Sequence, residues 1–508
     1  MREHNQLRSG VYLSYINLAL STLIPFLYTP IMLDMLGQAE YGLYSLANSV
    51  VGYLSLLSFG FGATIVRYLS KYRAEENLRE LERTYGFFLL LYSALAVLVL
   101  LGGLLLCGSV DTIFDRGLLP QELEKTRILV LIMAFNTALS FPLSVFSSVA
   151  IAYERYFFRK IMDILATVAA PLANLVALYL GYASVGMTVA ATLIQLLMAP
   201  VSILYCSRVL HLKPRFARLP GDLIREMVRV SFFHFLGAIV DMLFWATDKV
   251  ILGMLASSVA VAVYNIGATF NNMVVSLSTS ISGVLIPRIT GMVVTQRPKE
   301  EWSALFIRVG RLQFLIIALI VSGFSVFGQP FIYLWAGPEY ADAFWVAVLT
   351  LFPLCVPLIQ NTGISILSAQ NKHSFRSVVY LIIAVANVIS TYLAVPRMGI
   401  IGAALCSCIS YLLGQGVIMN IYYHKVTGLN IPLFWKNIAR MSVVPAAMLA
   451  AGLVLKQFIT LTGWLSFFAG VACYTAVYAL LMYCFAMNGS EKDLIRQPIR
   501  RILGRSHR

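Results

Sequence analysis

The sequence predicts an all-α polytopic membrane protein with 14 transmembrane helices. It contains 14 apolar stretches, most of them near or above the roughly 20 residues that a helix needs to cross a bilayer. Hydrophobic residues make up 59% of the chain, charged residues make up 12%, and the mean hydropathy is +0.80. Basic residues gather in alternate connections between the stretches. This composition excludes an ordinary soluble globular protein.

The predicted spans follow one another with short polar connections. Each is bounded by charged residues, glycine or proline, which mark the ends of a helix in an apolar run. In chain order they cover residues 9–36, 41–66, 84–107, 128–152, 161–180, 185–206, 231–255, 259–287, 310–334, 343–368, 377–396, 399–423, 437–461 and 464–486.

The distribution of Lys and Arg predicts the orientation of these spans. With a cytoplasmic amino terminus, 32 of the 38 basic residues fall in cytoplasmic segments. Because positive charge favours the cytoplasmic side, both termini are predicted to be cytoplasmic. The net charge of +15 then has anionic lipid head groups as its partner, and it requires no nucleic acid.

An internal repeat predicts two related lobes. Residues 31–36 match residues 250–255 at an offset of 219, and residues 152–159 match residues 369–376 at an offset of 217. Each repeat contains six spans, an even number, so a pseudo-twofold axis along the membrane normal should relate the lobes. The predicted parts are an amino-terminal six-helix lobe (1–208), a cytoplasmic basic linker (209–230), a carboxy-terminal six-helix lobe (231–425), helices 13 and 14 (437–486) and a basic cytoplasmic tail (487–508).

The connections leave little room for an enzyme. The longest outer loop, 108–127, has about 20 residues, and the chain lacks both a phosphate-binding Gly-rich loop and a His-Glu-x-x-His motif. The seven Cys lie within or at the ends of spans without metal-ligand spacing. We therefore expect no catalytic residues, no metal and no cofactor.

Ionisable residues in the seventh span are the strongest candidates for a transport site. His234, Asp241 and Asp248 are spaced by seven residues, so an unbroken helix would align them in one stripe, with Lys249 beside its outer end. Charges inside a membrane usually face protein or a wet cavity. Asp241 would then bind a proton or cation, or accept hydrogen bonds from sugar hydroxyls. In the structural alternative, His234, Asp248 and Lys249 reach the interface and meet water.

Four amides lie near the middle of the eighth and tenth spans. Asn271 and Asn272 are adjacent in the eighth, and Gln360 and Asn361 are adjacent in the tenth. They are candidates for lining a cavity and binding sugar hydroxyls. Hydrogen bonding to neighbouring helices is the commoner use of such amides.

Three arginines and two prolines are further candidates. Arg8 precedes the first span, and Arg67 and Arg288 end the second span of each repeat, where guanidinium groups can gather a lipid pyrophosphate. Ordinary positive-inside placement explains them equally well. Pro25 and Pro30 each remove a backbone hydrogen bond, which favours a bend and a gate in the first span.

The amino-terminal half resembles a known family. The stretches Gly-Val-Tyr-Leu-Ser-Tyr (10–15), Leu-Tyr-Thr-Pro-Ile-Met-Leu (27–33), Leu-Gly-Gln-Ala-Glu-Tyr-Gly-Leu-Tyr-Ser-Leu (36–46) and Gly-Phe-Gly-Ala-Thr-Ile-Val-Arg-Tyr (60–68) are similar to the signature of Wzx-type polysaccharide biosynthesis flippases. These belong to the multidrug/oligosaccharidyl-lipid/polysaccharide exporter superfamily. The resemblance extends over essentially the whole chain.

The resemblance implies a flippase of the bacterial plasma membrane. Its substrate would be an undecaprenyl-pyrophosphate-linked oligosaccharide, moved from the inner to the outer leaflet by alternating access while the lipid tail stays among membrane lipids. It would work beside glycosyltransferases and a polysaccharide polymerase.

Three alternatives remain open. A cation-coupled multidrug exporter shares the superfamily fold. A lipid II flippase shares the 14 spans and uses its added helix pair as a groove for the lipid tail, but its cavity is cationic and span 7 here is acidic. A glycosyltransferase or polymerase is disfavoured by the short outer loops.

Overall fold

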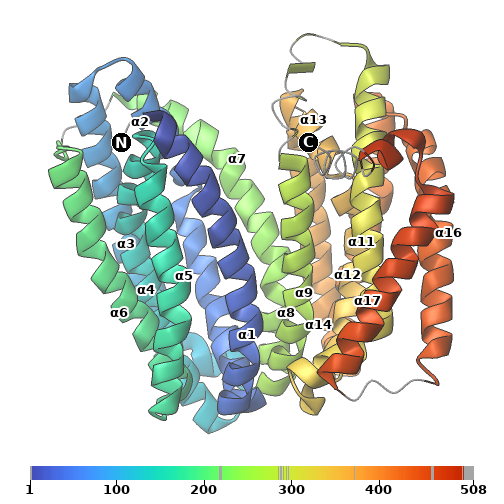
Figure 1. Ribbon diagram of the computed structural model, residues 1–508. Helices are drawn as coiled ribbons and strands as arrows, with labels where there is room; N and C mark the ends of the chain where they lie inside the picture. The colour runs from blue at the N-terminus through green and yellow to red at the C-terminus, as the bar shows by residue number, and fades with distance from the viewer. Residues whose placement is uncertain are drawn as a thin grey trace, which may run out of the picture. The chain divides into compact units, whose positions relative to one another are not determined.

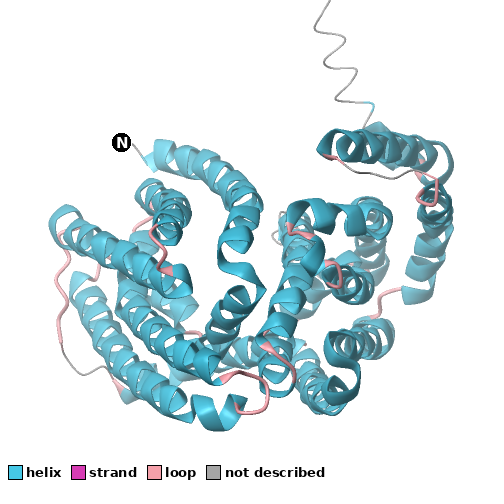
Figure 2. Ribbon diagram, turned by 90° about the horizontal axis from the view of Figure 1, so that it is seen from below, coloured by secondary structure: helices cyan, strands magenta, loops and turns pink. Residues whose placement is uncertain are grey.

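The computed structural model describes residues 3–216, 220–283, 285, 289, 291–292, 295, 297–370, 372–458, 463–494 and 496, with the backbone alone for residues 3–11, 233, 373 and 374. Figure 2 shows helices and loops, and no strand occurs among these residues. In chain order the helices are α1 (Glu3–Gly52), η1 (Tyr53–Ser58), α2 (Phe61–Ala74), α3 (Leu78–Phe114), α4 (Pro120–Ala152), α5 (Tyr156–Tyr179), α6 (Ala183–Leu204), η2 (Tyr205–Val209), α7 (Gly221–Trp245), α8 (Thr247–Leu255), α9 (Ser258–Gly283), α11 (Lys299–Trp335), η3 (Pro338–Tyr340), α12 (Ala343–Ile359), α13 (Asn361–Ala369), α14 (His373–Tyr411), η4 (Leu412–Ile418), α15 (Met419–Tyr422), η5 (Tyr423–Thr427), α16 (Ile431–Leu455), α17 (Trp464–Leu481) and η6 (Met482–Ala486). Figure 1 shows the longer ones as long rods in both halves of the chain.

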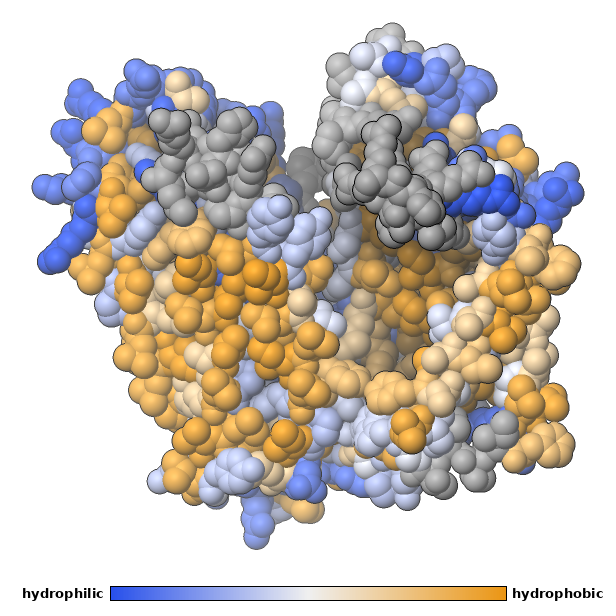
Figure 3. Space-filling view, viewed as in Figure 1, coloured by the Kyte–Doolittle hydropathy of each residue, from blue (hydrophilic) through white to orange (hydrophobic). Residues whose placement is uncertain are grey.

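The surface of these helices is that of a membrane protein. On the face drawn in Figure 3, hydrophobic residues cover the middle of the helices and hydrophilic residues gather at their ends. Leu105 and Leu197 each expose 74% of their surface. A bilayer core accepts such leucines and requires each backbone polar group to be satisfied within a helix. The prediction of an all-α multi-pass membrane protein is confirmed.

The number of membrane crossings is close to the predicted one. Among the described residues, 11 helices are long and apolar enough to span, or up to 12 if the bent pair α12 and α13 forms one span. Two of these candidates run for 63 and 53 residues, far beyond a single crossing, and contain the non-helical residues Gly37 and Gly399. Division of both at these glycines gives 14 spans only if the bent pair α12 and α13 also counts as one span, and this exact count stays a prediction.

The break in α1 lies at Gly37. Its backbone has φ 73° and ψ 170°, whereas Pro25 and Pro30 lie within the helix. This break falls between the first and second predicted spans, and the bend and gate predicted at Pro25 and Pro30 stay a prediction. Glycine can adopt this positive-φ conformation, which a Cβ atom makes unfavourable for other residues.

Replacement of Gly37 should destabilise the protein through the backbone alone. No atom lies within 4 Å of a Cβ built on Gly37. We expect Gly37→Ala to lower the free energy of unfolding by about 1–3 kcal/mol, measured by thermal or denaturant unfolding in detergent. Gly108→Ala in α3, which has similar open space and no positive φ, is the control. Equal stability of Gly37→Ala and the native protein would contradict the proposed strain.

The chain forms two compact units. Unit 1 comprises Met1–Asn265 and Val388–Ile400, and unit 2 comprises Ile266–Asn387 and Ile401–Arg508. The contacts thus place α7 and α8 in unit 1, whereas the repeat placed them in the second lobe. The predicted outer loop 108–127 is mostly helical, because α3 extends to Phe114 and α4 begins at Pro120.

The two units repeat the same local features. Phe158 stacks on Tyr205 in unit 1 with ring centroids 3.6 Å apart, and Phe375 stacks on Tyr422 in unit 2 at 4.1 Å. Both pairs are related by the 217-residue offset found in the sequence. His211 and Gly428, at the same offset, both have positive φ after a short π-helix. These features support the predicted duplication.

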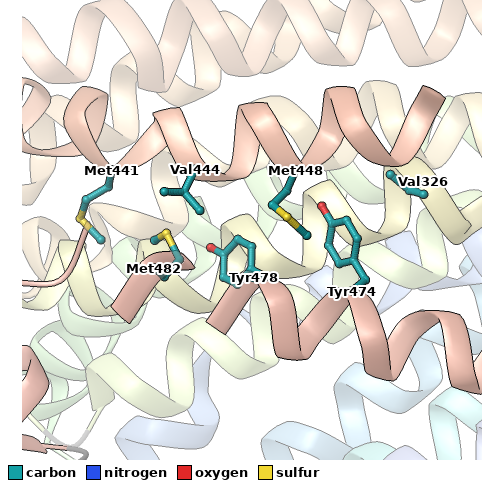
Figure 4. Packing of buried hydrophobic residues seen from close by; sticks show 7 residues of the cluster. All are labelled: Val326, Met441, Val444, Met448, Tyr474, Tyr478 and Met482. Carbon is teal, nitrogen blue, oxygen red and sulfur yellow. The ribbon is translucent and has the colours of Figure 1, made fainter. Parts of the chain in front are cut away.

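Small residues and side-chain layers hold the helices together inside each unit. In unit 1, a Cβ atom on Gly103 of α3 would lie 2.3 Å from the Cβ of Ala134 on α4, so glycine permits this close approach. In unit 2, side chains of α11, α16, α17 and η6 form a hydrophobic cluster (Figure 4). The buried members of this cluster are Val326, Met441, Val444, Met448, Tyr474, Tyr478 and Met482.

Candidate functional site

Asp241 lies in the wall of a cavity inside unit 1 whose lining includes several hydroxyl groups. This cavity, named here the Asp241 cavity, has a volume of about 580 Å³, and the Asp241 side chain is exposed. Its volume falls in the range of small-molecule sites. It is lined by Ser55, Leu56, Ser58, Gly62, Tyr92, Ser140, Phe141, Ser144, Ala238, Asp241, Met242 and Trp245 from η1, α2, α3, α4 and α7.

The lining of the Asp241 cavity is rich in hydrogen-bond acceptors. The hydroxyls of Ser55, Ser140 and Ser144 donate to backbone carbonyls three residues earlier, at distances of 2.6, 2.6 and 2.7 Å. Their oxygens keep lone pairs that can accept further hydrogen bonds, and an ionised carboxylate such as Asp241 only accepts. A ligand with several hydroxyl donors therefore matches this lining.

A second cavity, with an ion pair in its lining, lies between α4, α5 and α6. This Arg159 cavity has a volume of about 420 Å³. The Nη2 atom of Arg159 lies 3.0 Å from Oδ1 of Asp163, and its Nη1 donates to the Ser147 hydroxyl. Lys160 Nζ lies 3.7 Å from the other carboxylate oxygen of Asp163. The lining residues are Ser140, Leu143, Ser144, Ser147, Arg159, Met162, Asp163, Ala166, Ala170, Ala191, Ile194, Gln195, Met198, Ala199 and Ser202.

The structure separates the residues of the predicted stripe. α7 ends at Trp245 and α8 begins at Thr247, so the seven-residue spacing does not run along one helix. Asp241 is exposed to its cavity, whereas Asp248 is 1% exposed. His234 is exposed and packs against the backbone at Gly60. The prediction of one continuous stripe is therefore wrong.

Asp248 and Lys249 belong to a hydrogen-bond network inside unit 1. Asp248 accepts from the Tyr264 hydroxyl and, at 3.4 Å, from the Thr391 hydroxyl. Lys249 Nζ donates to Asn265 Oδ1 at 3.2 Å, and Asn265 donates to the hydroxyl of Tyr41 at 2.7 Å. The network links α1, α8, α9 and α14 and satisfies a buried carboxylate, as a low-dielectric interior requires.

Three of the four candidate amides join neighbouring helices in unit 2. Asn271 Nδ2 donates to the Thr350 hydroxyl at 2.9 Å, and Gln360 Nε2 donates to Asn420 Oδ1 at 2.7 Å. Asn361 Nδ2 donates to the Ser282 hydroxyl at 2.9 Å, and Asn272 is exposed. None of the four lines the cavities described here, and their bonds match the helix-packing alternative.

The structure describes the three predicted arginines to different extents. Arg67 is exposed on α2, with its guanidinium carbon 5.9 Å from the centre of the Tyr68 ring. Only the backbone of Arg8 is described, and Arg288 lies outside the described residues. The pyrophosphate role of these arginines stays a prediction.

An apolar cavity lies between α11, α16 and α17 of unit 2. Its volume is about 480 Å³, and Lys456 is the one charged residue in its lining. It adjoins the hydrophobic cluster of Figure 4, with which it shares Val326, Met448 and Tyr474. The lining residues are Val326, Phe327, Pro330, Met448, Ala451, Gly452, Leu455, Lys456, Gly470, Cys473, Tyr474 and Val477.

The Arg159 cavity was not predicted from the sequence, although the sequence carries one local signal for it. Arg159 and Asp163 are four residues apart, the spacing of an ion pair on a helix. Among the described residues, no group of three or more His, Cys, Asp or Glu is placed to hold a metal ion.

A helical chain with many membrane-spanning segments and cavities with polar side chains in one of its helical units has the architecture of a membrane transporter. Sequence comparison agrees, and the chain belongs to the polysaccharide biosynthesis protein family, whose model matches residues 7–293. The uncharacterized membrane protein EpsK of Bacillus subtilis strain 168 is 23% identical over 96% of both chains. The uncharacterized membrane protein MJ1068 of Methanocaldococcus jannaschii is 21% identical over 80% of this chain and 81% of its own.

Solved structures show the same fold. A structure of the lipid II flippase MurJ in an inward closed conformation superposes with a TM-score of 0.74 at 15% identity, covering 96% of this chain and 100% of that chain. An inward-facing multidrug resistance transporter of the MATE family gives a TM-score of 0.60 at 15% identity, covering 83% of this chain and 99% of that chain. These similarities place the chain in the fold shared by both kinds of transporter.

Proposed function

We propose that the protein is a flippase that moves a polyprenyl-pyrophosphate-linked oligosaccharide from the inner to the outer leaflet of the bacterial plasma membrane for cell-surface polysaccharide synthesis. The main support is membership of the polysaccharide biosynthesis family together with a hydroxyl-lined cavity inside a membrane-embedded unit. Alternating access of the duplicated lobes provides the movement.

The Asp241 cavity receives the glycan in this proposal. Asp241 and the serine oxygens accept hydrogen bonds from sugar hydroxyls. These contacts replace part of the hydration that the glycan loses on entering the membrane. Arg8, Arg67 and Arg288 hold the pyrophosphate at the cytoplasmic mouth by charge-assisted hydrogen bonds.

The apolar cavity holds part of the lipid tail. Its lining consists of hydrocarbon and aromatic side chains from α11, α16 and α17, and the last two helices are the pair outside the duplication. Contact with these side chains keeps the lipid tail in apolar surroundings while the head group crosses the membrane.

Filling the apolar cavity should weaken binding of the lipid. Gly470 of α17 lines the cavity, so Gly470→Phe places a ring in the space of the tail. We expect the dissociation constant for undecaprenyl pyrophosphate to rise about tenfold, measured by native mass spectrometry of the detergent-purified protein. Leu480→Phe changes an exposed residue of the same helix and is the control. Unchanged affinity in Gly470→Phe would exclude this cavity as the tail site.

Multidrug export is a second candidate function, because the MATE fold matches and an acidic cavity attracts cations. Deletion of the gene in its host distinguishes the two functions. The flippase proposal predicts loss of a surface polysaccharide with unchanged resistance to cationic dyes. Greater dye sensitivity with normal surface polysaccharide would support the exporter.

Cytoplasmic termini complete the proposed topology, with glycosyltransferases as donors of the substrate and a polymerase as its user outside. Cysteines introduced near either end of the chain should react with a membrane-impermeant maleimide only after cell lysis.

A further inference from the structure

We propose that the Arg159 cavity is a second sugar subsite, joined to the Asp241 cavity through α4, and that it accepts only an uncharged sugar. This inference rests on the proposed flippase function and specifies its substrate. It assigns a role to Arg159, Asp163, Ser147 and Gln195, which line a cavity that the first proposal does not use.

Two serines connect the cavities. Ser140 and Ser144 of α4 appear in the lining of both, so the cavities adjoin on two sides of the same helix segment. The two volumes, about 580 and about 420 Å³, are each of a size for a small ligand. Adjacent sugars of one oligosaccharide can therefore occupy adjacent cavities.

The two charged side chains that line the Arg159 cavity, Arg159 and Asp163, pair with one another. Arg159 and Asp163 are 3.0 Å apart, and Lys160 contacts the second oxygen of the same carboxylate without lining the cavity. An acidic sugar would compete with Asp163 for the guanidinium and place two carboxylates side by side. Such separation of a partly buried ion pair is costly.

A neutral sugar leaves this ion pair intact. Its hydroxyls can donate to Asp163 and accept from Arg159, while the Gln195 amide can do both. In the neighbouring Asp241 cavity, Asp241 is the one acidic or basic side chain of the lining, and its carboxylate form also repels a second carboxylate. Both cavities thus favour a glycan without acidic groups.

The second unit indicates that Asp163 is not required by the duplicated fold. Arg376 occupies the position of Arg159 at the 217-residue offset, and Tyr380 occupies the position of Asp163. The guanidinium carbon of Arg376 lies 4.5 Å from the centre of the Tyr380 ring. In unit 2 an aromatic ring takes the place of the carboxylate beside this arginine. The carboxylate of unit 1 is therefore available for selection of a ligand.

The test compares two synthetic polyprenyl-pyrophosphate disaccharides that differ only in the terminal sugar, glucose or glucuronic acid. Dissociation constants are measured by native mass spectrometry of the purified full-length protein. The native protein should bind the glucose probe at least about tenfold more tightly. Asp163→Asn should reverse the preference by removing the competing carboxylate. Gln195→Ala should weaken binding of the glucose probe several-fold. Asp115→Asn and Gln457→Ala, which change exposed residues, are the controls.

The outcomes separate this inference from the proposed function. Equal binding of both probes, or tighter binding of the glucuronic acid probe, overturns the inference and leaves the flippase proposal intact. An unchanged preference in Asp163→Asn together with native affinity in Gln195→Ala also overturns it. Failure to bind either probe contradicts both proposals.

Discussion

Replacement of Asp241 by Asn is expected to lower the rate of lipid-linked oligosaccharide translocation by about 10–100-fold. The carboxylate accepts hydrogen bonds from the glycan, and a bond to a charged group contributes about 1.5–3 kcal/mol. Because each 1.36 kcal/mol changes a rate about tenfold, loss of one such bond gives this range. The exposed position of Asp241 in a cavity of about 580 Å³ makes the residue accessible to the glycan.

The measurement for this first prediction is flipping by purified variants reconstituted into liposomes, with protein amount and folding checked for each. Asp241→Glu keeps the charge and should retain much of the activity. Asp115→Asn removes an exposed carboxylate just after α3 and should behave like the native protein. Native activity in Asp241→Asn would remove this residue from the transport path.

Replacement of Glu491 by Ala should cause the largest loss of stability. Arg311 of α11 donates to both carboxylate oxygens of Glu491, at 2.6 and 2.8 Å, and the two side chains are 8% and 2% exposed. Arg311 also donates to Asn437 of α16 and to the carbonyl of Ala486, both at 3.1 Å. The pair thus ties α11 and α16 to the segment that follows α17.

Removal of Glu491 leaves a buried guanidinium without its carboxylate, which costs about 3–5 kcal/mol. Denaturant or thermal unfolding in detergent measures this loss. The exposed pair Arg297 and Glu301, 3.2 Å apart, provides the control, since Glu301→Ala should cost less than about 1 kcal/mol. The double variant Arg311→Met, Glu491→Leu should recover most of the stability. A loss in Glu491→Ala no greater than that in Glu301→Ala would show that the pair is not structurally important.

The spans were predictable because membrane helices need long apolar runs, and such runs can be recognised in a contiguous stretch of sequence. Breaks inside a predicted span were less predictable. Gly37 falls between two predicted spans, whereas the break at Ala246, between α7 and α8, lies within one and carries no proline or glycine signal. That break places Asp241 and Asp248 in different environments. A periodicity argument that assumed a single helix therefore grouped them together incorrectly.

Contacts between distant residues lay beyond the sequence. Arg311 and Glu491 are separated by 180 positions, and no local pattern indicates their pairing. The Arg159–Asp163 spacing was visible, but its position in a cavity depends on the packing of α4 and α6 against α5. The amides of Asn271, Gln360 and Asn361 could be found by polarity alone, whereas their partners required the structure.

Reconstitution of the purified protein tests the central proposal most directly. Liposomes would contain a fluorescent polyprenyl-pyrophosphate oligosaccharide of neutral sugars, and a glycosidase added outside would cleave the glycan that reaches the outer leaflet. The flippase proposal predicts cleavage beyond the externally accessible fraction, at a rate that exceeds protein-free liposomes and falls in Asp241→Asn. Cleavage equal to that in protein-free liposomes, with transport of a cationic dye by the same preparation, would contradict it.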